Sequence, residues 1–130
     1  MMNLLSRENN VDEIVDSFWK HGYMTLSRKF GSYLPEPARI GNYEVEAIGK
    51  YKNNYVIGIT LTEEDLNNLE VYRKLEFLGS RNVKYSNRKV KLFVAVPRGL
   101  AVKARNIIAT LTEETRKNIK LIPIDTPAVN

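Results

Sequence analysis

The sequence contains no cysteine and a single histidine among its 130 residues. Without thiols, the chain can form no disulfide bond, no thiolate metal site and no cysteine nucleophile. No apolar run approaches the ~20 residues that a membrane-spanning helix needs, and residues 1–10 lack the apolar segment of a signal peptide. Glycine-rich phosphate-binding loops are also absent, which argues against dinucleotide-binding and P-loop enzymes. We therefore expect a cytoplasmic protein with no membrane partner.

What remains is the composition of one globular domain. Hydrophobic residues make up 43% and charged residues 27% of the chain, which suits a buried core under a solvated surface. A chain of this length favours a single domain over residues 1–130. Within it, residues 1–10 are left open to disorder, and residues 125–130 are expected to form a tail.

Positive charge is in excess, and its distribution is uneven. The net charge is +5 and the isoelectric point is about 9.5, which permits binding to phosphate backbones. Five cations and no acid occur in residues 81–91, RNVKYSNRKVK. Such a run is either a solvated loop or a surface that faces phosphates. Tyr33 and Tyr85, each near cations in a predicted loop, are candidates for stacking on bases.

Hydrophobic spacing predicts the helices and strands. Three segments have apolar residues at helical spacing, namely 11–22 with Gly22 as its cap, 63–78 and 99–110. Period-two or continuous apolar patterns predict five strands, namely 23–30, 43–50, 55–61, 90–96 and 119–124. Lys52-Asn53-Asn54 is the turn between the second and third strands, because asparagine tolerates the left-handed backbone conformation. Thr62 and Thr112 are suited to cap helix N-termini.

The same patterns indicate which side chains should be buried. In the first strand, Met24 and Leu26 are expected on the buried face. The expected buried face of the helix over 63–78 consists of Leu66, Leu69, Tyr72, Leu75 and Leu78. Strand 90–96 suits a central position that is covered on both faces, whereas Pro123 places the last strand at an edge. The order α-β-β-β-α-β-α-β is that of an α/β fold, with a mixed sheet flanked by helices.

Three segments carry a resemblance to a known family: residues 19–28, WKHGYMTLSR, residues 45–61, VEAIGKYKNNYVIGITL, and residues 92–97, LFVAVP. Their order and shape resemble the PD-(D/E)xK, or restriction endonuclease-like, nuclease superfamily. Within it they are most similar to the archaeal Holliday junction resolvases and related small endonucleases. The similarity spans about residues 11–97. It implies a restriction endonuclease-like core of αβββαβ order, to which the tail adds a helix and an edge strand.

The resemblance also implies where a nuclease site would lie. In the family, an acid from the second strand and the acid of a Glu-x-Lys pair on the third hold a divalent metal that activates water. Carried onto this chain, the first acid falls on Glu46, the second on Gly58 and the lysine on Thr60. Glu44 lies on the same side of the strand as Glu46, so the two form the one acidic pair to consider. The resemblance implies a degenerate site: no cofactor is expected, and Mg²⁺ or Mn²⁺ would bind only in a site rearranged around Glu46.

Three hypotheses for function follow. The first is a nuclease-fold protein that binds nucleic acid, DNA in preference to RNA, or supports a complex that does, without Glu-x-Lys catalysis. Its phosphate contacts would come from Arg28, Lys29, Arg81, Lys84, Arg88 and Lys89. The second is a metal-dependent endonuclease for junction or branched DNA, with a rearranged site around Glu46. The third is a homodimeric protein-interaction subunit of a complex for DNA repair or recombination.

Overall fold

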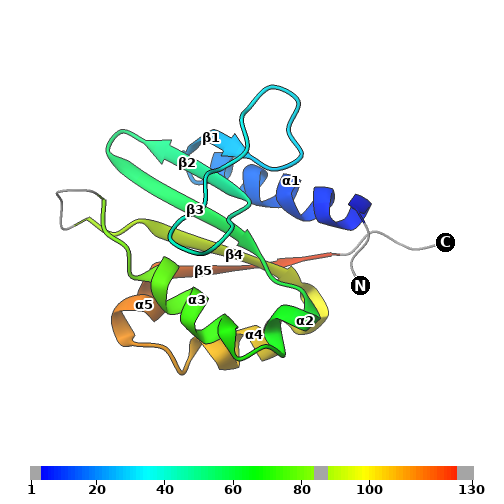
Figure 1. The fold of residues 1–130 in the computed structure, drawn as a ribbon, viewed down its shortest axis with the longest axis vertical. Coiled ribbons are helices and arrows are strands. Elements are labelled where there is room, and N and C mark those ends of the chain that lie inside the picture. The colour runs from blue at the N-terminus through cyan, green and yellow to red at the C-terminus, as the bar shows by residue number, and fades with distance from the viewer. Residues whose placement is uncertain (1–3, 84–87, 126–130) are drawn as a thin grey trace.

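The computed structural model describes residues 4–83 and 88–125, and its centre is a five-stranded sheet in the order β1-β2-β3-β4-β5 (Figure 1). The strands are β1 Met24–Arg28, β2 Ala47–Tyr51, β3 Asn54–Thr60, β4 Lys91–Pro97 and β5 Ile119–Ile124. The first three strands form an antiparallel meander, and β3, β4 and β5 run parallel. The predicted mixed sheet is confirmed, with β5 at an edge as Pro123 indicated.

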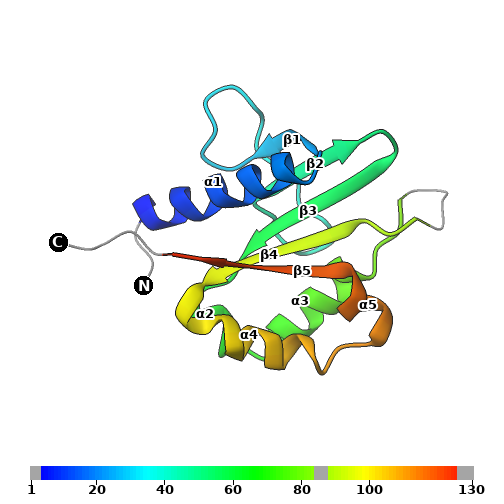
Figure 2. The ribbon, with the colours of Figure 1, turned by 180° about the vertical axis from the view of Figure 1, so that it is seen from behind.

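Helices cover both faces of the sheet. Helix α1, Leu4–Lys20, lies on one face, and the remaining helices lie on the other (Figures 1 and 2). These are α2 Glu63–Leu66, α3 Glu70–Gly79, the 3₁₀ turn η1 Arg98–Leu100, α4 Ala101–Ile108 and α5 Glu113–Asn118. The α/β class and the αβββαβ order with a further helix and edge strand are therefore confirmed. None of the helices in the described residues has the length and hydropathy that a membrane span requires.

Each face of the sheet has its own hydrophobic core. On the α1 side, Ile14 and Phe18 of the helix pack on Val56 and Phe93 of the sheet. The larger core lies on the other side, where strands β3 and β4 contact α3 and α4; it includes Ile57, Ile59, Leu75, Val94 and Ala104. Each fully buried Ile, Val or Phe contributes roughly 1.5–3 kcal/mol. Strand β4 contributes to both cores, as its continuous apolar run predicted.

The predicted helix over 63–78 is two helices. Thr62 caps α2 and forms a capping box with Asp65, as its sequence indicated. The helix then breaks, and the Asn68 side chain accepts a hydrogen bond of 2.9 Å from the backbone N–H of Glu70, where α3 begins. Asparagine side chains compete for backbone groups in this way. As a result Leu69, predicted to be buried, is 82% exposed, and Tyr72, predicted likewise, is also exposed.

The first strand presents the opposite face from the one predicted. Met24 is 67% exposed and Leu26 is 40% exposed, whereas Ser27 is buried. The pairing with β2 is irregular between Thr25 and Ser27. Such an irregularity, at an edge strand, changes which side chains face the core. The exposed Met24 consequently belongs to the surface beside the end of α1.

Two further boundaries differ from the sequence analysis. Helix α1 begins at Leu4, inside the segment that was left open to disorder. In the β2–β3 hairpin, Tyr51 pairs with Asn54, so the turn is formed by Lys52 and Asn53. The left-handed residue is Lys52, with φ of 54°, rather than an asparagine.

Candidate functional site

Glu46 lies just before β2 and contacts the end of β3. Its Oε1 accepts hydrogen bonds from the Thr60 hydroxyl at 2.8 Å and from the Thr60 backbone N–H at 3.2 Å. The Glu46 backbone N–H donates to the carbonyl of Gly58 at 2.9 Å. The three positions at which the resemblance placed the nuclease site are thus brought together. Thr60, at the lysine position, holds the carboxylate by neutral hydrogen bonds.

The electrostatic environment of Glu46 does not favour a metal-binding carboxylate. Burial raises its pKa above the ordinary value, although Lys74, the hydrogen bonds from Thr60, and Lys29 act in the opposite direction. Its Oε2 is buried and accepts no hydrogen bond from any described residue. A raised pKa favours the protonated form, which is a poorer ligand for a hard cation than a carboxylate.

Gly58 lies directly beneath helix α1. A Cβ atom at this position would be 2.3 Å from Cγ2 of Ile14 and 3.0 Å from Cζ of Phe18. Both of these side chains are fully buried, so they have little room to move. The position of the second acid is therefore occupied by the packing of α1 on the sheet, and a carboxylate there would require the helix to shift.

Glu44 does not complete a metal site with Glu46. Its carboxylate is exposed and forms ion pairs with Lys29 at 3.5 Å and with Arg39 at 3.8 Å. Across residues 4–83 and 88–125, no three His, Asp or Glu side chains are grouped so that they could hold a metal ion. The residues around Glu46 therefore do not fit the divalent metal that the resemblance implies.

Most of the predicted phosphate contacts already have partners within the chain. Three of the cations form ion pairs, namely Arg28 with Asp12, Lys29 with Glu44 and Lys89 with Glu114. The guanidinium of Arg81 lies 5.1 Å from the ring centre of Phe77. Arg88 is exposed, while Lys84 and Tyr85 fall outside the described residues.

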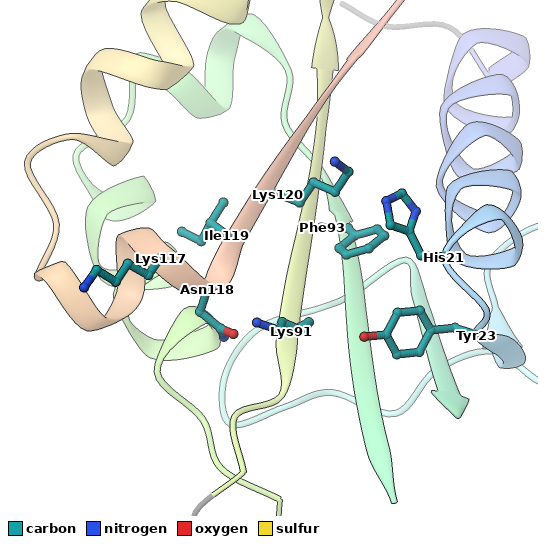
Figure 3. Close-up of a pocket in the computed structure, with 8 residues that line it drawn as sticks. All are labelled: His21, Tyr23, Lys91, Phe93, Lys117, Asn118, Ile119 and Lys120. Atoms are coloured by element: carbon teal, nitrogen blue, oxygen red, sulfur yellow. The ribbon is translucent and has the colours of Figure 1, made fainter. Parts of the chain in front are cut away.

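A different set of cations lines a cavity of about 280 Å³ beside β4 and β5. We call it the basic pocket, and the residues that matter most in it are His21, Tyr23, Lys91, Phe93, Asn118 and Lys120 (Figure 3). Lys91 and Phe93 lie two apart on β4, and Phe93 is in register with Lys120 on β5. Side chains two apart on a strand share a face, so Lys91 flanks Phe93 there. Both lysines are exposed.

The walls of the basic pocket are held in place by contacts within the fold. The rings of His21 and Tyr23 meet that of Phe93 edge-on, with centroids at 5.2 and 6.1 Å. His21 Nδ1 donates to the carbonyl of Ser17 at 2.7 Å. Asn118 donates to the carbonyls of Gly79 and Val90 and so fixes the start of β5. The pocket is therefore a formed feature rather than a gap between loops.

Charge in the basic pocket is of one sign. No aspartate or glutamate of the described chain lines it. Lys117, which also lines it, is paired with Glu113 at 2.8 Å. Lys91 and Lys120 have no ion pair with any residue that the structure describes. They are the two cations of the pocket that are available to an external anion.

The sequence patterns do not single out Lys91 and Lys120. Lys91 falls within the basic run over 81–91 without a separate role, and Lys120 falls within the predicted last strand. The available signal was a lysine at the second position of each of two predicted apolar strands, 90–96 and 119–124, in Val90-Lys91-Leu92-Phe93 and Ile119-Lys120-Leu121-Ile122. A charged residue within an otherwise buried strand suggests a local opening in the cover of the sheet.

Comparisons with known proteins add little to the geometry. No protein-family model matches the chain, and no curated protein matches it. Among solved structures it is similar to a repair endonuclease from Pyrococcus abyssi, with a TM-score of 0.46 and 14% sequence identity. The match covers 92% of this chain and 47% of that one, so the chain spans about half the length of its structural neighbour. At this level of similarity, function has to be argued from the residues of the site.

Proposed function

We propose that the chain binds nucleic acid through the basic pocket and does not cleave it by Glu-x-Lys chemistry. The observation that carries the proposal is the pair of exposed lysines, Lys91 and Lys120, which flank Phe93 without an ion pair to any described residue. An acid-free pocket with exposed cations attracts polyanions, and phosphate backbones are the polyanions that lysines neutralise most effectively. The net charge of +5 supports the same partner.

The two lysines are placed to contact the phosphates of one nucleic-acid strand. They lie on adjacent strands and on the same face of the sheet, with their amino groups apart from one another (Figure 3). Phosphates would supply the counter-charge to both lysines, and binding would release condensed counter-ions from the nucleic acid. The absence of cleavage rests on separate features, namely the packing of Ile14 against Gly58 and the hydrogen bonds from Thr60 to Glu46.

Fluorescence anisotropy with labelled DNA oligonucleotides tests the proposal. The wild-type protein should bind at about 50 mM salt and lose most of its affinity by about 200 mM, because bound phosphates displace counter-ions. A Lys91→Glu/Lys120→Glu variant should bind at least about tenfold more weakly. The slope of the logarithm of its binding constant against the logarithm of salt concentration should be smaller by roughly two. No cleavage should accompany binding when Mg²⁺ or Mn²⁺ is added.

A matched control separates the pocket from net charge. Lys103→Glu/Arg105→Glu places the same charge change on α4, on the far face of the sheet. Each double variant lowers the net charge from +5 by the same amount. If both variants weaken binding equally, the pocket is not the binding surface. If the wild-type protein binds no nucleic acid at low salt, the proposed function is wrong.

A further inference from the structure

A second hollow, of about 350 Å³, adjoins the basic pocket. We call it the aromatic hollow, and its main residues are Trp19, Tyr23, Met24, Lys50, Tyr51 and Lys52. Tyr23 lines both cavities, so the two share that residue as a wall. They lie where the β2–β3 hairpin extends past the end of α1, so that the helix no longer covers the sheet (Figures 1 and 2).

The aromatic hollow exposes large apolar side chains that the fold does not use. Phe18 takes the buried position at the end of α1, and its neighbour Trp19 is left 76% exposed. Met24 is 67% and Tyr51 is 51% exposed in the same hollow. Clustered exposure of this kind marks a surface for a ligand or partner. Lys52 lies 5.4 Å from the ring centre of Tyr51, so positive charge accompanies the aromatic surface.

We propose that the basic pocket and the aromatic hollow form one site for single-stranded nucleic acid. Lys91 and Lys120 hold its phosphates, and Trp19 and Tyr51 stack on its unpaired bases. This rests on the proposed function and adds the class of nucleic acid. In a duplex the faces of the bases are covered by their neighbours, whereas a single strand offers them to aromatic side chains. Cations alternating with exposed aromatic rings are the arrangement that such strands require.

The charge of the surface argues against a second copy of the chain as the occupant. In a two-fold symmetric dimer the same patch lies on both sides of the interface. The four lysines at positions 50, 52, 91 and 120 would then face the same four lysines. No acid among the described residues lines either cavity to compensate for them. A polyanion satisfies both the charge and the exposed rings.

Trp19 is the single tryptophan of the chain, so its intrinsic fluorescence reports on the site directly. Titration with a single strand of about 12 nucleotides, within the length that known stacking grooves cover, should quench this fluorescence. A duplex of the same sequence, added at equal phosphate concentration, should quench it much less. Measurement in about 50 mM salt keeps both forms bound, so the difference reports on stacking rather than on occupancy.

Variants at Trp19 provide the second test. Trp19→Ala should weaken single-strand binding by about 5- to 100-fold, the range that stacking of one base on one ring gives. Trp19→Phe should restore most of the affinity, and neither change should alter duplex binding more than about twofold. Tyr72→Ala is the matched control, because Tyr72 is an exposed aromatic residue of α3, on the other face of the sheet, and lines neither cavity. It should leave both affinities unchanged.

The outcomes separate this inference from the function on which it rests. If both forms of DNA bind through Lys91 and Lys120, but Trp19→Ala has no effect and fluorescence is not quenched, the single-strand site is wrong and the proposed function stands. If neither form binds, the proposed function fails. If the chain self-associates in sedimentation experiments, and Trp19→Ala abolishes that without affecting DNA binding, the aromatic hollow is a dimer surface and the inference is overturned.

Discussion

The site around Glu46 and the basic pocket lie on the same sheet but are built in opposite ways. Thr60 lies four residues beyond Val56, which is in register with Lys91, so the two sites are about 13 Å apart along the strands. Around Glu46, helix α1 lies directly on Gly58 and the carboxylate is held by Thr60. At the basic pocket, the helix has ended and Lys91 is exposed.

The difference shows that the length of one helix decides which part of the sheet is covered and which part is exposed. Ile14 packs over Gly58 and leaves no space for a side chain there. Past Lys20 the sheet is left without helical cover, and the side chains there are His21, Tyr23 and the two lysines. The packing of α1 on Gly58 contributes to stability, and the open site is available for binding. Variants around Glu46 should therefore change stability, and variants at the basic pocket should change binding.

Gly58→Asp should have the largest effect. The new Cβ would clash with Ile14 at 2.3 Å, and the carboxylate would be buried without a partner, so we expect a loss of about 4 kcal/mol or more. Urea denaturation followed by circular dichroism measures it. Gly99→Ala is the control, because nothing lies within 4 Å of its added Cβ. A Gly58→Asp protein of normal stability would show that the position is open and that a second acid fits there.

Thr60→Val should have the next largest effect. Valine keeps the shape of threonine but removes the hydroxyl that donates to Glu46 at 2.8 Å. Loss of one hydrogen-bond donor to a half-buried carboxylate lowers the free energy of unfolding by about 1–2 kcal/mol. The pKa of Glu46 should rise further, because the Thr60 hydrogen bonds lower it. Thr25→Val on β1 is the control and should cost less than about 0.5 kcal/mol. Equal stability of Thr60→Val and wild type would mean that the carboxylate is not held there.

Glu46→Gln should change the pH dependence of stability. Burial raises the pKa of Glu46 in the folded chain, so folding carries no electrostatic cost while this side chain is protonated. As pH rises from the ordinary pKa of glutamate, near 4, through the raised pKa of the folded chain, Glu46 ionises and the free energy of unfolding falls. Glutamine does not ionise. The variant should therefore gain stability relative to wild type across this window, and the difference should level off above it.

Urea denaturation between about pH 4 and pH 8 checks this expectation. Glu44→Gln is the control, since the Glu44 carboxylate is exposed and the change should stay within about 0.5 kcal/mol at each pH. A stability difference between Glu46→Gln and wild type that stays constant or shrinks as pH rises would contradict the raised pKa. Such a result would bring back the alternative of a charged, ligand-binding Glu46.

The sequence predicted the order of elements because their hydrophobic patterns are local. The continuous run of β4 and the caps at Thr62 and Thr112 are of this kind. The positions of Glu46, Gly58 and Thr60 came from the family resemblance, carried along one hairpin. What spacing did not predict is that Ile14 fills the place beside Gly58, because that contact joins segments far apart in the chain.

The basic pocket was missed for the same physical reason. Lys91 and Lys120 come together through the parallel register of β4 and β5, which no local pattern specifies. Three of the cations that the sequence did single out form ion pairs in the fold, such as Arg28 with Asp12 at 2.6 Å. Exposure was misjudged at Met24, which pairs with Lys50 on the edge strand β1 and is 67% exposed. Local patterns therefore predicted elements, and only tertiary contacts distinguish free cations from paired ones.

Lys91→Gln should have the smallest effect on stability and a large one on binding. The side chain is exposed and has no ion pair with any described residue, so the free energy of unfolding should change by less than about 0.5 kcal/mol. Nucleic-acid affinity should nevertheless fall at low salt. Urea denaturation and anisotropy on the same preparation measure both. A loss of stability above about 1 kcal/mol would mean that Lys91 supports the fold, and the contrast between the two sites would then no longer hold.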